Sequence, residues 1–265
     1  MSLEYKRSAA IILIFFSILF TTDLIPVESM TIGVHAYDRK EVLEKKFTPL
    51  AEYLSEKTGK DFKLYVSESY VDHITKVGND LYDISFMGPI GYVTMVRSFG
   101  KKEILAILGG EDSQILTGRI IVNKKSDIYK LSEIKIDELA FVDIRSTMGF
   151  VIPFHQWLIE NKMDNNKAMF KFLGSHYNVV TAVLSGDIPA GAVKEETYQK
   201  YCKNRCRVIY TCPEVTDHCF IASDKIKDPL LNNIKTILLE MSDNENGVSI
   251  IKNIRTDLER FVSGA

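Results

Sequence analysis

The sequence lacks the basic stripe that marks a nucleic-acid-binding protein. Its 33 Lys and Arg against 35 Asp and Glu give a formal net charge of −2, with the two signs interspersed along the chain. A nucleic-acid-binding domain carries clustered positive charge, and a single-strand binder interleaves aromatic residues with Lys and Arg. The aromatic residues here are scattered. We therefore expect no nucleic-acid partner.

Motifs of catalysis and metal binding are missing as well. The chain has no phosphate loop of the Walker type, no G-x-S-x-G nucleophile elbow and no pair of carboxylates at a recognisable spacing. It has no C-x-x-C, which both a haem-attachment motif and the common zinc motifs require. We therefore expect no enzymatic activity, no cofactor and no metal.

Cysteine is scarce, and all four residues lie late in the chain, at Cys202, Cys206, Cys212 and Cys219. In an exported protein an even number suggests one or two disulfides, with free buried thiols and a metal site as alternatives. Cys202 and Cys206 are spaced i, i+4, a poor geometry for a bridge on a regular helix. We predict that one of these two pairs with Cys212 or Cys219.

Long apolar runs are absent except near the N-terminus. Lys6 and Arg7 precede an apolar stretch over residues 9–20, and polar residues end it. Roughly 12 apolar residues are too few for a bilayer core, which needs about 20. Residues 1–29 are therefore predicted to be a signal peptide cleaved after Ser29, with an uncleaved membrane anchor as the alternative. Both predict a periplasmic or extracytoplasmic location.

Strand and helix patterns alternate from residue 31 onward. The predicted strands cover residues 31–36, 61–66, 84–87, 104–108, 119–123, 139–142, 170–173, 188–193 and 207–210. Helices fall between most of them, and two helical stretches, 230–241 and 248–261, come last. Such alternation predicts an α/β fold with parallel sheets covered by helices. In these folds ligands bind beyond the carboxyl ends of the strands, where helix N-termini point.

Three strand-to-helix junctions are therefore candidate ligand-binding segments, at residues 86–89, 146–149 and 174–177. Gly88 lets the backbone approach a ligand closely. Ser146 and Thr147 add hydroxyl groups to the free amides of a helix start, which suits an oxyanion, although either residue can simply cap the helix. His176 follows a strand in a similar way and can donate to an anion.

Pro153 disturbs the helix that follows the second junction. It lacks an N–H group and would crowd the carbonyl of Gly149 in a regular helix. We therefore expect residues 147–152 to be kinked or loosely helical, which leaves backbone amides free for a ligand.

Three segments together resemble the phosphate/phosphite/phosphonate-binding proteins of ABC transporters. They are YDISFMGPIGYVTMV (82–96), FVDIRSTMGFVIPFHQWL (141–158) and FLGSHYNVVTAVLSGDIPAGAV (172–193). The resemblance extends over residues 31–265 and implies a type II periplasmic-binding-protein fold. That fold has two lobes with mixed, mostly parallel sheets and a hinge of two crossover strands. Lobe 1 would comprise residues 30–115 and 212–265, and lobe 2 residues 116–211.

The resemblance also implies which residues bind the ligand: Tyr37, Gly88, Ser146, Thr147, Met148, His176 and Asp217. The family's Ser-Thr-Ser-Gly oxyanion segment falls on residues 146–149, and its anion-contacting His falls on His176. In the family, the acid matched by Asp217 can meet a cationic part of the ligand. Two positions depart from the pattern, because Met148 replaces a hydroxyl residue and Pro189 replaces the usual Asp.

The function that this resemblance implies is binding, not catalysis. We expect an extracytoplasmic protein that closes on a small oxyanion, such as phosphate, phosphite or a phosphonate, and passes it to an ABC permease in the membrane. The alternative is the extracytoplasmic ligand-sensing domain of a membrane signalling receptor, such as a histidine kinase, because such receptors use the same fold.

Overall fold

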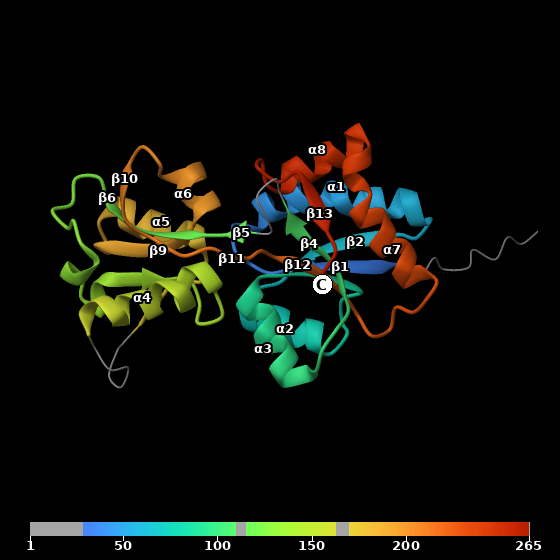
Figure 1. The fold of residues 1–265 in the computed structure, drawn as a ribbon, viewed down its shortest axis with the longest axis horizontal. Coiled ribbons are helices and arrows are strands. Elements are labelled where there is room, and N and C mark those ends of the chain that lie inside the picture. Colours follow the sequence, from blue (N-terminus) through green and yellow to red (C-terminus); the bar gives the residue numbers. More distant parts are fainter. Residues whose placement is uncertain (1–28, 110–114, 163–169, 265) are drawn as a thin grey trace, which may run out of the picture.

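The computed structural model describes residues 29–109, 115–162 and 170–264, which form two lobes, each a β-sheet covered by helices (Figure 1). The predicted signal peptide or anchor falls on residues that lie, except for Ser29, outside these ranges. Within these ranges, no helix combines the length and the apolar character needed to cross a bilayer.

The first lobe is built on a six-stranded sheet with the strand order β13-β4-β12-β3-β1-β2. The strands are β1 (Met30–Val34), β2 (Phe62–Val66), β3 (Ile84–Met87), β4 (Ile104–Gly109), β12 (Cys219–Ala222) and β13 (Arg260–Val262). Its helices are α1 (Lys40–Thr58), α2 (Tyr70–Gly78), α3 (Pro89–Phe99), α7 (Leu230–Leu239) and α8 (Glu245–Ile254), with a short 3₁₀ turn at Met241–Asp243. Helices α1, α7 and α8 lie on one face of the sheet, and α2 and α3 lie on the other (Figure 1).

The second lobe is built on a five-stranded sheet with the order β10-β6-β9-β7-β8. The strands are β6 (Gly118–Asn123), β7 (Leu139–Phe141), β8 (Lys171–Phe172), β9 (Ala190–Lys194) and β10 (Cys206–Thr211). Helices α5 (His176–Ser185) and α6 (Glu195–Tyr201) lie on one face, and α4 (Ile152–Asn161) lies on the other (Figure 1). A π-helical turn at Thr147–Val151 precedes α4, and 3₁₀ turns occupy Leu131–Glu133 and Ile136–Glu138.

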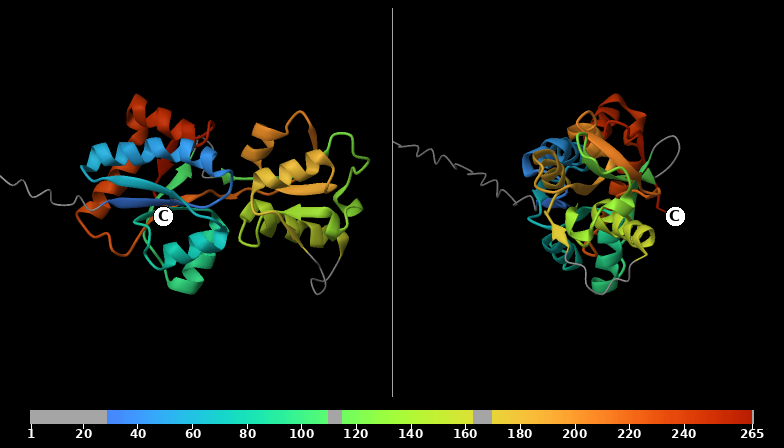
Figure 2. Two further views of the ribbon diagram at one scale, coloured as in Figure 1. Left: turned by 180° about the vertical axis from the view of Figure 1, so that it is seen from behind. Right: turned by 90° about the vertical axis from the view of Figure 1, so that its left-hand side faces the viewer.

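Two short strands join the lobes. β5 (Ile115–Leu116) pairs antiparallel with β11 (Val215–Thr216), with Leu116 opposite Val215. Figure 2 shows this ribbon pair lying between the two globular halves. The hinge of two crossover strands that the family resemblance implies is therefore present.

Local sequence signals set the helix ends that face the gap between the lobes. The hydroxyl of Ser69 accepts the amide of Asp72 and caps α2, and the hydroxyl of Ser175 accepts the amide of Asn178 and caps α5. Pro89 is the first residue of α3, where its missing N–H costs no helical hydrogen bond.

The sheets are more mixed than the sequence pattern alone predicts. β12, which the sequence reading missed, lies between β3 and β4 and is antiparallel to both. The predicted helix over residues 248–261 is wrong in its second half, since α8 ends at Ile254 and Arg260–Val262 forms β13. Short buried apolar runs such as Cys219–Ala222 have no period that distinguishes a strand from a helix.

The predicted disulfide pairing is wrong. All four cysteines are buried free thiols. Cys206 begins β10 and Cys212 follows its end, so at about 3.3 Å per residue they lie roughly 20 Å apart, whereas a bridge needs Cα atoms within about 7 Å. The amide of Cys206 donates to the carbonyl of Cys202 at 2.8 Å, which places Cys202 at the same distant end. Cys219 lies on β12 in the other lobe.

An aromatic core holds the second junction in place. Phe150, in the π-helical turn, packs edge-on against Phe141 of β7, with ring centroids 5.0 Å apart. Phe154 and Trp157 of α4 extend this cluster, and the indole N–H of Trp157 donates to the Ile134 carbonyl at 2.8 Å. The segment around residue 147 is therefore anchored to the rigid sheet of lobe 2.

Candidate functional site

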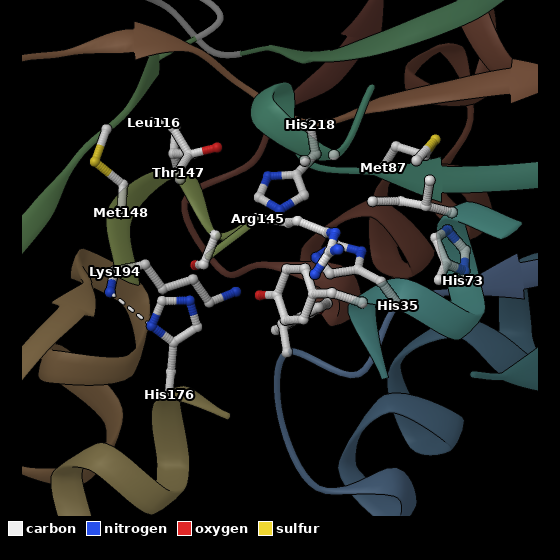
Figure 3. A pocket seen from close by; sticks show the side chains of 16 residues that line it. His35, His73, Met87, Leu116, Arg145, Thr147, Met148, His176, Lys194 and His218 are labelled. Atoms are coloured by element: carbon white, nitrogen blue, oxygen red, sulfur yellow. Dashed lines mark hydrogen bonds between the residues drawn. The ribbon is translucent and has the colours of Figure 1, made fainter. Parts of the chain in front are cut away.

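A small cavity lies between the lobes and is lined by residues from both (Figure 3). The lining residues are His35, Tyr37, Tyr70, His73, Ile74, Met87, Gly88, Gly91, Leu116, Arg145, Ser146, Thr147, Met148, His176, Lys194 and His218. We call this cavity, with these residues as its wall, the cleft. Its volume of about 20 Å³ is room for about one water. A larger cavity of about 1230 Å³ shares Tyr37, Leu116, Lys194 and His218 with it.

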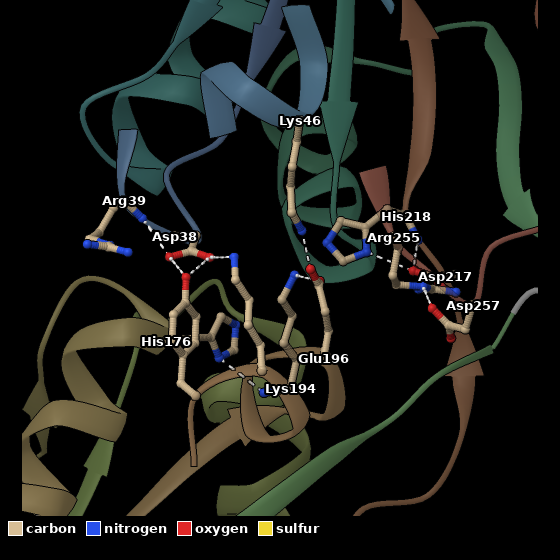
Figure 4. A network of polar contacts seen from close by, with 12 residues as sticks. Asp38, Arg39, Lys46, His176, Lys194, Glu196, Asp217, His218, Arg255 and Asp257 are labelled. Carbon is tan, nitrogen blue, oxygen red and sulfur yellow. Dashed lines mark hydrogen bonds and ion pairs between the residues drawn. The ribbon is translucent and has the colours of Figure 1, made fainter. Parts of the chain in front are cut away.

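Six of the seven predicted site residues line the cleft, and Asp217 does not. The Asp217 side chain is fully buried, and its Oδ1 accepts from the amide of His218 at 2.7 Å and from His218 Nδ1 at 2.8 Å. Its other oxygen, Oδ2, pairs with Arg255 (Figure 4). Asp217 therefore orients His218 and forms no part of the cleft wall.

The second junction has the irregular backbone that Pro153 predicts. Residues 147–151 form a π-helical turn in which the amide of Ile152 bonds to the carbonyl of Thr147. Ser146 caps this turn, since its hydroxyl accepts the amide of Gly149 at 3.1 Å. The amides of Thr147 and Met148 have no acceptor among the residues that the structure describes. They are free donors at the start of a helix.

Thr147 connects the two lobes. Its hydroxyl oxygen accepts the amide of Ile90, in the first turn of α3, at 3.1 Å. Because the oxygen accepts this bond, the hydroxyl hydrogen remains available to donate into the cleft. Gly88 caps the same helix from lobe 1.

Met148 fills space at the hinge. It is 1% exposed and clusters with Leu116 and Cys212. It also lies close to the backbone of Gly118, where an added Cβ would come within 2.8 Å of the Met148 Cβ. The thioether that replaces the family's hydroxyl therefore packs against the crossover strands.

His176 is held as a neutral hydrogen-bond donor. It begins α5, and its Nδ1 accepts the amide of Lys194 at 3.2 Å, so the ring proton is on Nε2 (Figure 3). Burial, and then the nearby charge of Lys194, lower the pKa of His176 well below its ordinary value. The amide of His176 also donates to the Tyr37 carbonyl at 3.3 Å, which is a second contact between the lobes.

Lys194, which the sequence reading missed, places a buried cation in the cleft. Its Nζ lies 3.6 Å from the centroid of the Tyr37 ring and 2.6 Å from Glu196 Oε2. The other oxygen of Glu196 pairs with Lys46 of α1, so three charges bridge the lobes with a net charge of +1 (Figure 4). Burial lowers the pKa of Lys194, and Glu196 opposes that shift.

Histidines form the other part of the site that sequence reasoning missed. His35, His73 and His218 line the cleft with His176, and burial lowers the pKa of all four. His35 and Lys194 lie at the carboxyl ends of β1 and β9, so the strand-end rule that identified His176 would have found them too. Across the parts of the chain that the structure describes, no group of His, Cys, Asp or Glu has the geometry of a metal site.

The arrangement suits a small anion. Lys194 and Arg145 supply positive charge, and Ser146 and Thr147 supply hydroxyls. Helices α3 and α5 begin at the cleft, from opposite lobes, with the positive ends of their dipoles. Among the described residues, no Asp or Glu lines the cleft. Carboxylates, among them Glu196 and Asp257, line the larger cavity that shares Tyr37, Lys194 and His218 with the cleft.

Comparison with known proteins gives one consistent result. Residues 32–264 match the family model described as "ABC transporter, phosphonate, periplasmic substrate-binding protein". A probable ABC transporter phosphite binding protein of Prochlorococcus marinus is 22% identical over 247 residues, which cover 85% of this chain and 82% of the relative.

Two solved structures share the fold. The Prochlorococcus marinus protein in complex with methylphosphonate superposes with a TM-score of 0.79 at 18% identity, covering 89% of this chain and 92% of that one. A binding protein component of an ABC phosphonate transporter from Pseudomonas aeruginosa gives a TM-score of 0.80 at 18% identity, covering 89% and 81%.

Proposed function

Because the chain belongs to the family of periplasmic substrate-binding proteins of ABC phosphonate transporters, we propose that it captures a small tetrahedral oxyanion outside the cytoplasm and delivers it to a membrane permease. Phosphate, phosphite and small alkylphosphonates are the candidate ligands. The relative with 22% identity is named as a phosphite binder, and the solved relative holds methylphosphonate. Both names support this class of ligand.

The observation that carries the proposal is the donor set of the cleft. Thr147 and Met148, whose amides have no acceptor among the described residues, line the cleft together with the hydroxyl residue Ser146, with His176 and with Lys194. Burying an anion without directed donors costs several kcal/mol, so such a set is what an oxyanion site needs. We assign ligand contact to Tyr37, Gly88, Ser146, Thr147 and His176, and add Lys194.

Ligands with an ammonium group fit this cleft poorly. Both oxygens of Asp217 are engaged by His218 and Arg255. Glu196 is neutralised by two lysines. An aminoalkylphosphonate would bring an unpaired cation next to Lys194, and like charges in a water-poor site repel strongly. We infer that the ligand is a plain oxyanion without a cationic tail.

Closure of the lobes around the ligand is part of the proposal. Several contacts join the lobes, among them Ile90 to Thr147, His176 to Tyr37, Lys194 to the Tyr37 ring, Lys46 to Glu196, and Tyr201 to Asp38. Domain closure of this kind excludes water and brings donors from both lobes to the ligand. The family is defined by substrate binding for transport, and neither its description nor the relatives' names support the histidine-kinase sensor alternative or an enzyme.

Isothermal titration calorimetry with phosphate, phosphite, methylphosphonate and 2-aminoethylphosphonate tests the proposal. We expect saturable binding of at least one of the first three, and weaker binding of the aminoalkylphosphonate than of methylphosphonate. If none of the plain oxyanions binds, the proposed ligand class is wrong. If 2-aminoethylphosphonate binds more tightly than methylphosphonate, the argument from the missing carboxylate is wrong.

A further inference from the structure

Four of the chain's five histidines line the cleft. Binding an anion through neutral hydrogen-bond donors does not require so many imidazole rings. Each comes from a different element: His35 follows β1, His73 lies on α2, His176 begins α5 and His218 precedes β12. All four are buried. The fifth, His155, is exposed on α4. We therefore compare the four cleft histidines by the groups that would stabilise or oppose a positive charge on each ring.

Three of them are held in ways that favour the neutral ring. His176 Nδ1 accepts the Lys194 amide, so a proton there would break that bond. His73 Nδ1 lies 2.9 Å from the Ser67 hydroxyl, and burial lowers the pKa of His73 to about 3. His35 Nδ1 lies 3.1 Å from the Phe86 carbonyl, and its ring contacts no carboxylate among the described residues.

His218 differs because a buried carboxylate supports it. Nδ1 lies 2.8 Å from Asp217 Oδ1, so Nδ1 carries the ring proton and Nε2 is the basic nitrogen. Nε2 points toward the N-terminus of α3, since a Cβ at Gly88 would lie 3.3 Å from it. Figure 4 shows the chain that runs from His218 through Asp217 to Arg255. An imidazole held in this way can accept a proton on its cleft side while the carboxylate stabilises the resulting cation.

Other groups oppose that charge before an anion binds. The groups that face His218 are Asp217, Arg255, His35, Tyr37, His176 and Lys194. Burial is the main reason that the pKa of His218 is lowered, and Lys194 and Arg255 add to that shift, whereas Asp217 opposes it. An oxyanion bound beside Lys194 supplies the missing negative charge. It would shift the balance toward the imidazolium.

We propose that His218, positioned by Asp217, takes a proton from solvent onto Nε2 when the cleft closes on its oxyanion, so that ligand and proton bind together. This inference rests on the proposed oxyanion function. The bond formed is Nε2–H, the proton donor is the buffer acid, and no other bond changes. A charge-assisted hydrogen bond from an imidazolium to the anion is roughly twice as strong as a neutral one. Asp217 acts through His218 and is a positioning residue.

Linkage fixes the sign of the pH dependence. If the complex holds the proton more tightly than the free protein, the pKa of His218 is higher in the complex. Between the two pKa values, affinity then falls as pH rises, by at most about tenfold per pH unit. Reciprocity requires the same coupling to appear as proton uptake on binding.

The test is calorimetry of methylphosphonate binding at pH 7 in buffers of different ionisation enthalpy. The slope of the observed binding enthalpy against the ionisation enthalpy of the buffer gives the number of protons taken up on binding. The ligand's own protonation contributes equally in all variants. We expect wild type to take up more protons than His218→Gln, by up to one. Asp217→Asn should show an intermediate value, and His155→Gln should match wild type.

Each outcome has a defined meaning. Equal uptake by wild type and His218→Gln overturns the inference, and so does a loss of uptake in His176→Gln but not in Asp217→Asn. If His218→Gln does not fold, the comparison of Asp217→Asn with His155→Gln decides, and equal uptake in those two overturns the inference. Wild-type binding without proton uptake also overturns it but leaves the proposed function intact. Absence of binding to any plain oxyanion overturns the proposed function itself.

Discussion

Replacing Thr147 with Ala removes one hydroxyl from the cleft without changing its charge. In the structure this hydroxyl accepts the Ile90 amide at 3.1 Å, which links α3 to lobe 2. Under the proposed function it also donates to the anion. A neutral hydrogen bond contributes about 0.5–1.5 kcal/mol and one to a charged group about 1.5–3 kcal/mol. The two losses together come to about 2–4.5 kcal/mol, which raises Kd roughly 30- to 2,000-fold.

The assay is calorimetric titration with the tightest-binding oxyanion of the panel. Thr147→Ser retains the hydroxyl and should stay close to wild type. Thr181→Ala is the matched control, because Thr181 is exposed on α5 and its hydroxyl bonds only within that helix. If affinity falls only about 2- to 12-fold in Thr147→Ala, the loss of the contact between the lobes accounts for it, and the ligand contact is refuted. A Kd within twofold of wild type would refute both.

Three further changes test other parts of the structure. Glu196→Gln leaves two buried lysines without their carboxylate and should lower the free energy of unfolding by about 3–5 kcal/mol. Urea denaturation against the surface variant Glu44→Gln measures this, and equal stabilities would contradict it. His73 has a pKa of about 3 when folded and about 6.5 when unfolded, so the unfolded state binds more protons at acid pH and stability falls there. Between pH 7.5 and 5, urea denaturation of wild type should lose about 2 kcal/mol more than that of His73→Gln, and equal losses would disprove this reasoning. Met148→Ser should open a cavity at the hinge and lower the free energy of unfolding by about 2–4 kcal/mol, which lowers Tm by roughly 4–16 °C. We expect no gain in oxyanion affinity. Tighter binding would show that residue 148 faces the ligand.

The sequence predicts the architecture well because strand and helix signals are local. Ser146, Thr147 and His176 are identified by their positions at strand-to-helix junctions, and the structure brings them into one cleft. Pro153 predicts the irregular turn before α4 for a simple steric reason.

Some of what sequence reasoning missed depends on contacts between distant segments. Lys46 and Glu196 pair across a separation of 150 positions, which no local pattern indicates. Lys194 lies at a strand end, which the sequence indicates, but its pairing with the carboxylate that also binds Lys46 is not indicated. Asp217 is expected from the family to meet the ligand, but burial and pairing with Arg255 turn it toward His218. All three residues belong to the first lobe, but Arg255 is 38 positions from Asp217, so no local pattern indicates this pairing.

Small-angle X-ray scattering of the protein with and without ligand measures whether the two lobes close on a small oxyanion. With methylphosphonate at a concentration that calorimetry shows to be saturating, we expect a smaller radius of gyration than for the ligand-free protein. An unchanged scattering profile at verified saturation would contradict it.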